Sequence, residues 1–293
     1  MKPSQSAPSR GSAASPELAA ERVIRAALLE DLGDRGDVTT DAIVDSNLRA
    51  HARLVARREG VVAGVPFAAM AFRILDDRVE TRATVAEGAR IEANAVIAEI
   101  AGPARAILTG ERTALNLLGR LCGIATATRR LVDLVAGTRA KIADTRKTTP
   151  GLRALERYAV RCGGGSNHRF GLYDAVLIKD NHLALAGSVR AAIDRARTSA
   201  GDGMKIEIEV DTLAQLREAL EEPIDAVLLD NMKPQQLAEA VRIVNGRAIT
   251  EASGGVTEAN VAEIARTGVD VISIGAITHS APALDLSLEM DLP

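Results

Sequence analysis

Aromatic residues are scarce in this sequence, and there is no excess of positive charge. Its 293 residues include three Phe, two Tyr and no Trp, and 36 Lys and Arg are set against 39 Asp and Glu. Proteins that bind nucleic acids stack bases on aromatic rings and present a basic surface. The composition therefore argues against nucleic acid as a partner. Apolar residues make up 47% of the chain, so a large core of Ala, Val, Leu and Ile is expected.

A long hydrophobic run is also missing. The longest apolar stretch covers residues 61–72 and ends at Arg73, whereas a helix that spans a membrane needs about 20 apolar residues. Residues 1–15 are rich in Ser, Ala and Pro but lack the apolar segment of a secretory signal, so they are predicted to form a disordered tail. Neither a membrane partner nor secretion is expected.

Cysteine and histidine are rare as well. Cys122 and Cys162 belong to no C-x-x-C pair, and two isolated thiols are typical of a reduced, cytoplasmic protein rather than of a disulfide scaffold. None of the four histidines stands at a zinc-ligand spacing such as H-E-x-x-H. A structural metal is therefore not expected.

The first part of the chain has the pattern of a small α+β domain. Ser15 and Pro16 suit the N-cap and first turn of a helix that Gly33 can end. Between residues 51 and 100, short β-like runs alternate with Gly and Asn, which indicates a mostly antiparallel sheet. An apolar stripe over residues 103–136 then predicts helix, broken into two helices by the glycines between 119 and 123.

From Lys141 onward, short apolar runs alternate with amphipathic helices. The runs cover residues 142–143, 175–178, 206–210, 226–229, 248–250 and 269–274. This alternation implies parallel strands joined by helices. An eight-unit barrel takes about 250 residues, but only about 140 lie between Lys141 and Ser280. An incomplete α/β barrel of about six strands is therefore predicted, with an open doubly wound sheet as the alternative.

Charged and small side chains follow these runs, at the strand ends where such folds bind ligands. With the segment before the second run included, they are Thr145, Arg146, Lys147, His168, Arg169, Lys179, Glu209, Asp230, Ser253, Gly254, Gly255, Gly275, Ala276 and His279. A nearly neutral protein that gathers cations on one face is building an anion site.

Two kinds of anionic group are expected there. Arg146 and Arg169 carry the planar fork that suits carboxylates, whereas a lysine is a point charge that suits phosphate. The Gly-rich residues 253–255 would let backbone N–H groups approach a phosphate. Glu209 and Asp230, inside this cationic surround, indicate ribose hydroxyls, Mg²⁺ or a cationic carbon in a transition state.

Seven segments form a recognisable set. They are Glu111-Arg112-Thr113-Ala114-Leu115-Asn116, Thr145-Arg146-Lys147-Thr148, Asn167-His168-Arg169, Lys179-Asp180-Asn181-His182, Leu228-Leu229-Asp230-Asn231, Ser253-Gly254-Gly255 and Gly275-Ala276-Ile277-Thr278-His279. In this order they resemble the quinolinate phosphoribosyltransferases, the carboxylating nicotinate-nucleotide pyrophosphorylases. The resemblance runs from about residue 17 to residue 290.

The resemblance implies an arrangement in two domains. Residues 16–122 would form an N-terminal α+β open sandwich that the C-terminal segment 281–293 joins, and residues 123–280 would form the incomplete barrel. It also implies a homodimer, with a hexamer left open, in which Arg112 enters the active site of the partner subunit.

The resemblance also implies a reaction and the residues that carry it. Phosphoribosyl pyrophosphate and quinolinate would give nicotinate mononucleotide, pyrophosphate and CO₂, a step of de novo NAD biosynthesis. Quinolinate would be held by Arg112, Thr145, Arg146, His168, Arg169 and Lys179. Phosphoribosyl pyrophosphate would be held by Lys147, Glu209, Asp230, Ser253, Gly254, Gly255, Ile274, Gly275, Ala276 and His279. Lys147, Lys179, Glu209 and Asp230 would be catalytic, and Glu209 and Asp230 would contact the Mg²⁺ cofactor, directly or through water.

Three other functions stay open at this point. A paralogous transferase of the same fold, such as the molybdenum-operon relative, would use another acceptor. A phosphate-binding barrel aldolase or decarboxylase would form an imine on Lys179. A non-catalytic anion-binding protein would gain nothing from Glu209 and Asp230. The common purine-salvage loop, two acids followed by a T-G-x-T turn, is missing from the sequence.

Overall fold

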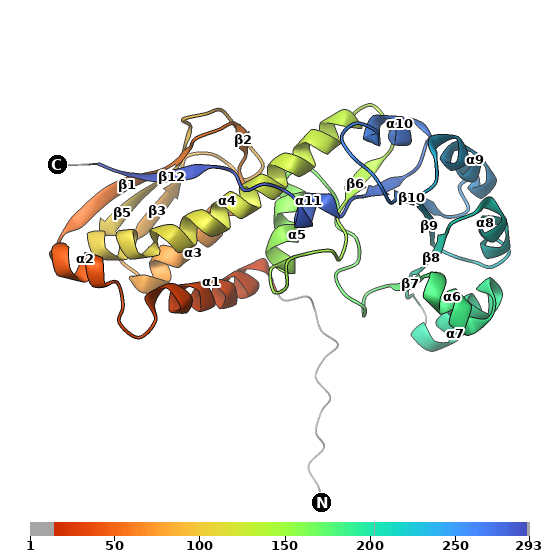
Figure 1. Cartoon of the computed structure of the whole chain (residues 1–293), viewed down its shortest axis with the longest axis horizontal. Coiled ribbons are helices and arrows are strands. Elements are labelled where there is room, and N and C mark those ends of the chain that lie inside the picture. The colour runs from red at the N-terminus through yellow and green to blue at the C-terminus, as the bar shows by residue number, and fades with distance from the viewer. Residues whose placement is uncertain (1–14, 202, 292–293) are drawn as a thin grey trace, which may run out of the picture.

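Two main sheets organise the chain, and one long helix runs between them (Figure 1). The computed structural model describes residues 15–201 and 203–291. Apart from Ser15, the tail predicted over residues 1–15 lies outside the described residues. No helix in the part of the chain that the structure describes is long and apolar enough to cross a membrane.

The first sheet is antiparallel and has the strand order β12-β1-β5-β3. Its strands are β12 (Leu286–Met290), β1 (Arg49–Ala56), β5 (Val96–Pro103) and β3 (Glu80–Ala83). Helices α1 (Pro16–Leu32), α3 (Val65–Leu75) and α4 (Ala104–Leu134) lie on one side of it (Figure 1), and α2 (Val38–Ile43) and the small pair β2 (Gly60–Val61) and β4 (Arg90–Ile91) complete this part. The predicted mostly antiparallel α+β unit is confirmed.

The first helix begins and ends where the sequence predicts. The Ser15 side chain accepts a hydrogen bond from the backbone N–H of Leu18, and Pro16 occupies the first turn. Gly33 follows the last residue of α1 with a φ of 48°, in the left-handed region that glycine adopts without strain.

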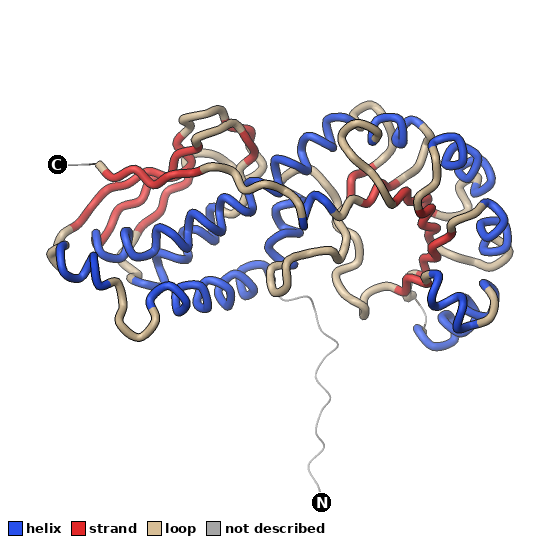
Figure 2. The backbone as a smooth tube through the Cα atoms, viewed as in Figure 1, coloured by secondary structure: helices blue, strands red, loops and turns tan. Residues whose placement is uncertain are grey.

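The second sheet contains six parallel strands in the order β6-β11-β10-β9-β8-β7. They are β6 (Lys141–Ala143), β7 (Val176–Ile178), β8 (Ile206–Val210), β9 (Ala226–Asp230), β10 (Ile249–Ser253) and β11 (Val271–Ser273). The strands curve into an arc, and the helices lie on its outer side (Figure 2). The order leaves β6 and β7 at the two edges, so the predicted incomplete barrel is confirmed and the doubly wound alternative is wrong.

Seven helices accompany this sheet in the described residues. They are α5 (Arg153–Cys162), α6 (Asp180–Ala186), α7 (Val189–Ala200), α8 (Leu213–Ala219), α9 (Pro234–Val244), α10 (Val261–Arg266) and α11 (Ala276–His279). The capping box predicted at Thr212 is present, because Thr212 accepts from the N–H of Gln215 and the Gln215 side chain accepts from the N–H of Thr212.

The prediction of two helices across residues 103–136 is wrong, because α4 is continuous. Its glycines serve close packing instead. A Cβ on Gly119 would lie 2.9 Å from the carbonyl oxygen of Leu284, and one on Gly123 would lie 3.0 Å from the carbonyl carbon of Pro282. The segment that leads to β12 therefore crosses α4 at a distance that only glycine permits. The domain boundary predicted between residues 122 and 123 falls inside this helix.

The segment after the barrel returns to the first sheet. β12 pairs antiparallel with β1, with Leu54 opposite Leu288. The backbone N–H of Leu284 donates to the carbonyl oxygen of Gly119 just before this strand. An edge position of the N-terminal sheet is thus filled by residues more than 200 positions away in the sequence.

Candidate active site

A pocket of about 630 Å³ opens at the carboxyl ends of the six parallel strands. It brings together nearly all of the residues that the sequence singled out. These are Thr145, Arg146, Lys147, His168, Arg169, Lys179, Glu209, Asp230, Ser253, Gly254, Gly255, Ile274, Gly275, Ala276 and His279. Parallel strands explain the meeting, because their carboxyl ends lie at one edge of the sheet.

A lysine and two acids occupy neighbouring strand ends in the pocket. Lys179 Nζ lies 2.5 Å from Glu209 Oε2. Burial, with the negative charges of Glu209 and Asp211, raises the pKa of Asp230 above its ordinary value. A bound cation would relieve this repulsion between carboxylates. Hard oxygen ligands of this kind suit Mg²⁺.

Glycine-rich turns after β10 and β11 also line the pocket. Gly254 and Gly255 have φ values of 89° and 60°, a consecutive left-handed pair that favours glycine. At Gly275, a Cβ would lie 2.9 Å from Lys147 Cδ and 3.2 Å from His279 Nε2. The absence of a side chain at Gly275 therefore lets a lysine and a histidine approach the same backbone.

Two arginines face the pocket from the β6 end. Burial, and then the positive charge of Arg146, lowers the pKa of Arg169. The Arg169 guanidinium donates one hydrogen bond, from Nη1 to the carbonyl oxygen of Ala175 at 3.0 Å. Arg146 Nε is buried and has no hydrogen-bond partner in the described residues. Both the charge and the open donor suit a carboxylate ligand.

His168 lies between two buried glutamates, a contact that the sequence analysis did not foresee. Its Nε2 is 3.1 Å from Glu207 Oε2 and 3.4 Å from Glu251 Oε2. Burial opposes protonation of the ring, but the hydrogen bonds and charges of the two glutamates outweigh it and raise the pKa of His168 to about 10. The Nδ1 atom accepts the backbone N–H of Arg169 at 2.8 Å, so Nδ1 would have to release that group to take a second proton. Both ring nitrogens therefore have protein partners.

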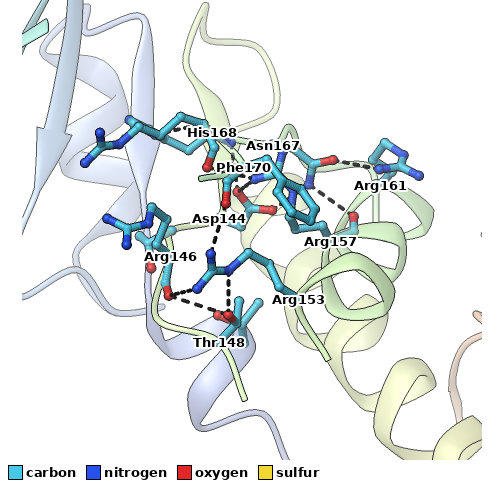
Figure 3. A network of polar contacts seen from close by, with 12 residues as sticks. Asp144, Arg146, Thr148, Arg153, Arg157, Arg161, Asn167, His168 and Phe170 are labelled. Atoms are coloured by element: carbon cyan, nitrogen blue, oxygen red, sulfur yellow. Dashed lines mark hydrogen bonds and ion pairs between the residues drawn. The ribbon is translucent and has the colours of Figure 1, made fainter. Parts of the chain in front are cut away.

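A buried carboxylate at the end of β6 connects several of these residues (Figure 3). Asp144 is 0% exposed, and burial raises its pKa. It accepts the backbone N–H of His168 at 2.8 Å, Nδ2 of Asn167 at 2.5 Å and Nη1 of Arg157 at 3.4 Å. Neither Asp144 nor Arg157 was predicted to belong to the site. The sequence feature that points to Arg157 is the repeat of arginines at every fourth residue of α5.

Arg112 is the exception among the predicted site residues. It is exposed on α4 and lines a separate pocket of about 260 Å³ beside α1, with Arg120 among its neighbours. It is not among the described residues that line the pocket at the strand ends. Within one chain, the structure does not bring Arg112 together with the other candidates.

Comparison with known families assigns both parts of the chain. The model described as "Quinolinate phosphoribosyl transferase, C-terminal domain" matches residues 124–289, and that for the N-terminal domain matches residues 37–122.

Individual relatives agree with the family models. A probable nicotinate-nucleotide pyrophosphorylase [carboxylating] of Bacillus subtilis is 45% identical over 264 residues, covering 90% of this chain and 91% of that protein. The enzyme of that name from Mycobacterium leprae is 45% identical over 280 residues, covering 93% and 97%. The crystal structure of nicotinate-nucleotide pyrophosphorylase from Ehrlichia chaffeensis superposes with a TM-score of 0.88 at 41% identity, covering 92% of this chain and 98% of that one. The chain therefore belongs to the quinolinate phosphoribosyl transferase family.

Proposed function

We propose that this protein transfers the phosphoribosyl group of phosphoribosyl pyrophosphate to quinolinate with loss of CO₂. The products are nicotinate mononucleotide, a precursor of NAD, and pyrophosphate. The observation that carries the proposal is one pocket in which two arginines, two lysines and three carboxylates meet at the carboxyl ends of the parallel strands. Family membership and the names of the relatives support the same reaction.

The two arginines supply the clamp for the substrate ring. Arg146 and Arg169 would each take one of the two neighbouring carboxylates of quinolinate, because a guanidinium can form two parallel hydrogen bonds to a carboxylate. Lys179 adds a positive charge to the same pocket. Holding both carboxylates orients the ring nitrogen toward the sugar, which converts an encounter into a positioned reaction.

The turns after β10 and β11 would hold the phosphates. Lys147 and His279 pack against Gly275, and Gly254 and Gly255 leave backbone uncovered in the same pocket. Lysine charge and backbone N–H groups neutralise phosphate oxygens. Pyrophosphate leaves more easily when its developing charge is balanced, and Lys147 is the residue placed to do this.

Glu209 and Asp230 are the residues that would hold Mg²⁺, directly or through water. Burial, and then the negative charge of Glu209, raises the pKa of Asp230, so a bound cation would be stabilised beside these two carboxylates. When bound, Mg²⁺ would neutralise the pyrophosphate. The same carboxylates face the place where the ribose carbon becomes cationic, and their charge stabilises it.

Decarboxylation needs no further group in this proposal. Once the ring nitrogen carries the ribose, it is positively charged and stabilises the electron pair that stays on the adjacent carbon when CO₂ leaves. A proton then replaces the lost carboxylate. Lys179 thus acts by its charge and forms no imine.

Arg112 would complete the site of a second subunit in a homodimer. Its exposure on α4, away from the pocket of its own chain, supports this role. Mixing two inactive variants, Arg112→Ala and Arg146→Ala, should restore activity, because some mixed dimers contain one site with both arginines. If Arg112 acted within its own chain, no mixture would regain activity.

A turnover assay tests the reaction itself. Purified protein with quinolinate, phosphoribosyl pyrophosphate and Mg²⁺ should release CO₂ and nicotinate mononucleotide in equal amounts, and a chelator should stop the release. Nicotinate in place of quinolinate is the matched control, since it has one carboxylate fewer. Turnover of nicotinate alone would assign another acceptor.

A further inference from the structure

Three arginines follow one another at every fourth residue of α5. Arg153, Arg157 and Arg161 point from this helix toward the end of β6 and the segment around residues 167–170 (Figure 3). These are the two stretches of chain that carry Arg146 and Arg169. The helix therefore lies behind both of the arginines proposed to bind the carboxylates.

Arg153 bridges the two stretches with a single guanidinium. Its Nη2 donates to the carbonyl oxygen of Arg146 at 3.3 Å, and its Nη1 donates to the carbonyl oxygen of Phe170 at 3.1 Å. Its Nε donates to Thr148 Oγ1 at 3.0 Å. One side chain thus ties the backbone after β6 to the backbone after Arg169.

Arg157 makes the corresponding contact one helical turn further on. Its Nη1 donates to the carbonyl oxygen of Arg169 at 3.2 Å and to Asp144 Oδ1 at 3.4 Å. Its guanidinium carbon lies 5.2 Å from the centre of the Phe170 ring. The residue is only 9% exposed, so solvent competes little for these bonds.

Arg153 and Arg157 thus each donate to the main-chain carbonyl of one pocket arginine. The backbone N–H of Arg169, in the preceding peptide group, donates to His168 Nδ1 at 2.8 Å. The two guanidinium groups can bind two neighbouring carboxylates at once only at one separation, because both pairs of hydrogen bonds must form together.

We propose that Arg153 and Arg157 are positioning residues that set the separation of Arg146 and Arg169, and so select a ligand with two neighbouring carboxylates. The role rests on the proposed function, in which those two arginines bind quinolinate. Arg153 and Arg157 contact backbone carbonyls and neighbouring side chains of the protein, so they act through the residues that they hold.

Arginine-to-lysine variants test this without removing the positive charge. In Arg153→Lys and Arg157→Lys, a single ammonium replaces a fork and cannot reach both partners. Arg161→Lys is the matched control, because Arg161 is exposed on the same helix and donates to the side-chain oxygen of Asn167 rather than to a pocket arginine. The binding probe is benzene-1,2-dicarboxylate, which has both carboxylates but no ring nitrogen and so cannot react.

We expect Arg153→Lys and Arg157→Lys each to raise the Kd for benzene-1,2-dicarboxylate, measured by calorimetry, and the KM for quinolinate about tenfold. The KM for phosphoribosyl pyrophosphate should stay within about twofold of wild type, and Arg161→Lys should change none of the three. If Arg157→Lys does not fold, Arg153→Lys decides, since Arg153 is only partly buried.

Two results would overturn the proposal. An unchanged Kd for the dicarboxylate in folded Arg153→Lys would show that the backbone contacts do not set the clamp. A parallel rise in the KM of both substrates would show a general structural role. The proposed reaction is judged separately, by wild-type turnover, because the binding measurement needs no chemistry.

Discussion

The contact between Arg120 and Glu156 joins the long helix to the barrel, and its loss should weaken the whole fold. Glu156 on α5 has a side chain that is 0% exposed, and Arg120 Nη2 lies 2.8 Å from its Oε1. The same guanidinium donates from Nη1 to the carbonyl oxygen of Ala281 at 3.2 Å, and also contacts the carbonyl oxygen of Thr278. Arg120→Met keeps most of the volume of the side chain but removes the charge.

The loss of stability in Arg120→Met depends on the buried carboxylate of Glu156, which remains without its partner. Glu156 keeps one hydrogen bond, from the backbone N–H of Thr149 to Oε2 at 3.1 Å, but its charge has lost its partner. Removing one partner of a buried ion pair costs about 3–5 kcal/mol. Because 23% of the Arg120 side chain is exposed, we expect the lower limit, about 3 kcal/mol. For a chain of this length that lowers the thermal midpoint by about 5 °C.

Thermal and urea unfolding, followed by circular dichroism at one protein concentration, would measure this loss. The matched variant is Arg120→Met combined with Glu156→Gln, which removes the unpaired charge as well. It should be more stable than Arg120→Met alone, because a neutral amide costs less to bury than a carboxylate. A loss below about 1 kcal/mol in the single variant, or a double variant that is less stable still, would refute the reasoning.

Three further predictions concern packing, a thiol and the substrate clamp. Gly123→Ala should lower the thermal midpoint, because overpacking against Pro282 costs about 1–3 kcal/mol or more. This cost exceeds the ~1 kcal/mol that alanine gains over glycine in a helix. A midpoint at or above that of wild type would show that residues 282–284 shift to make room for the methyl group. Burial, and then the charge of Glu87, raises the pKa of Cys162 to about 11, so iodoacetamide should label it slowly at pH 8 and faster as the pH rises and thiolate forms. Fast labelling of the native protein at pH 8 would contradict this. Arg169→Lys should raise the KM for quinolinate about 10- to 100-fold, because one ammonium cannot replace the two hydrogen bonds of a guanidinium. The KM for phosphoribosyl pyrophosphate should change little. Wild-type kinetics would show that Arg169 does not bind a carboxylate of quinolinate.

The alternation of strands and helices was enough to predict where the pocket lies. Parallel strands all end at one edge, so residues as distant as Arg146 and Asp230 were expected to meet there, and they do. The order of the elements and the direction of the strands alone determine this meeting point. It is the same whichever strands are neighbours in the sheet.

The errors and omissions concern contacts between distant parts of the chain. Gly119 and Gly123 were interpreted as helix breakers from local propensity, whereas their neighbours are residues 282–284. The partners of His168 were missed for a similar reason. Glu207 and Glu251 lie on strands separated by β9, and their shared contact with one histidine depends on the curvature of the sheet. Local sequence patterns carry no information on that curvature.

The position of β12 has a consequence for how the protein is made. Synthesis runs from the N-terminus, so β1 emerges early, while β12 emerges after every other strand in the described part of the chain. Until then, one side of β1 has open backbone N–H and C=O groups, a form prone to pair with other chains. A nascent chain that stalls within the barrel would keep this open edge. The first sheet can therefore be completed only after the whole barrel has been translated.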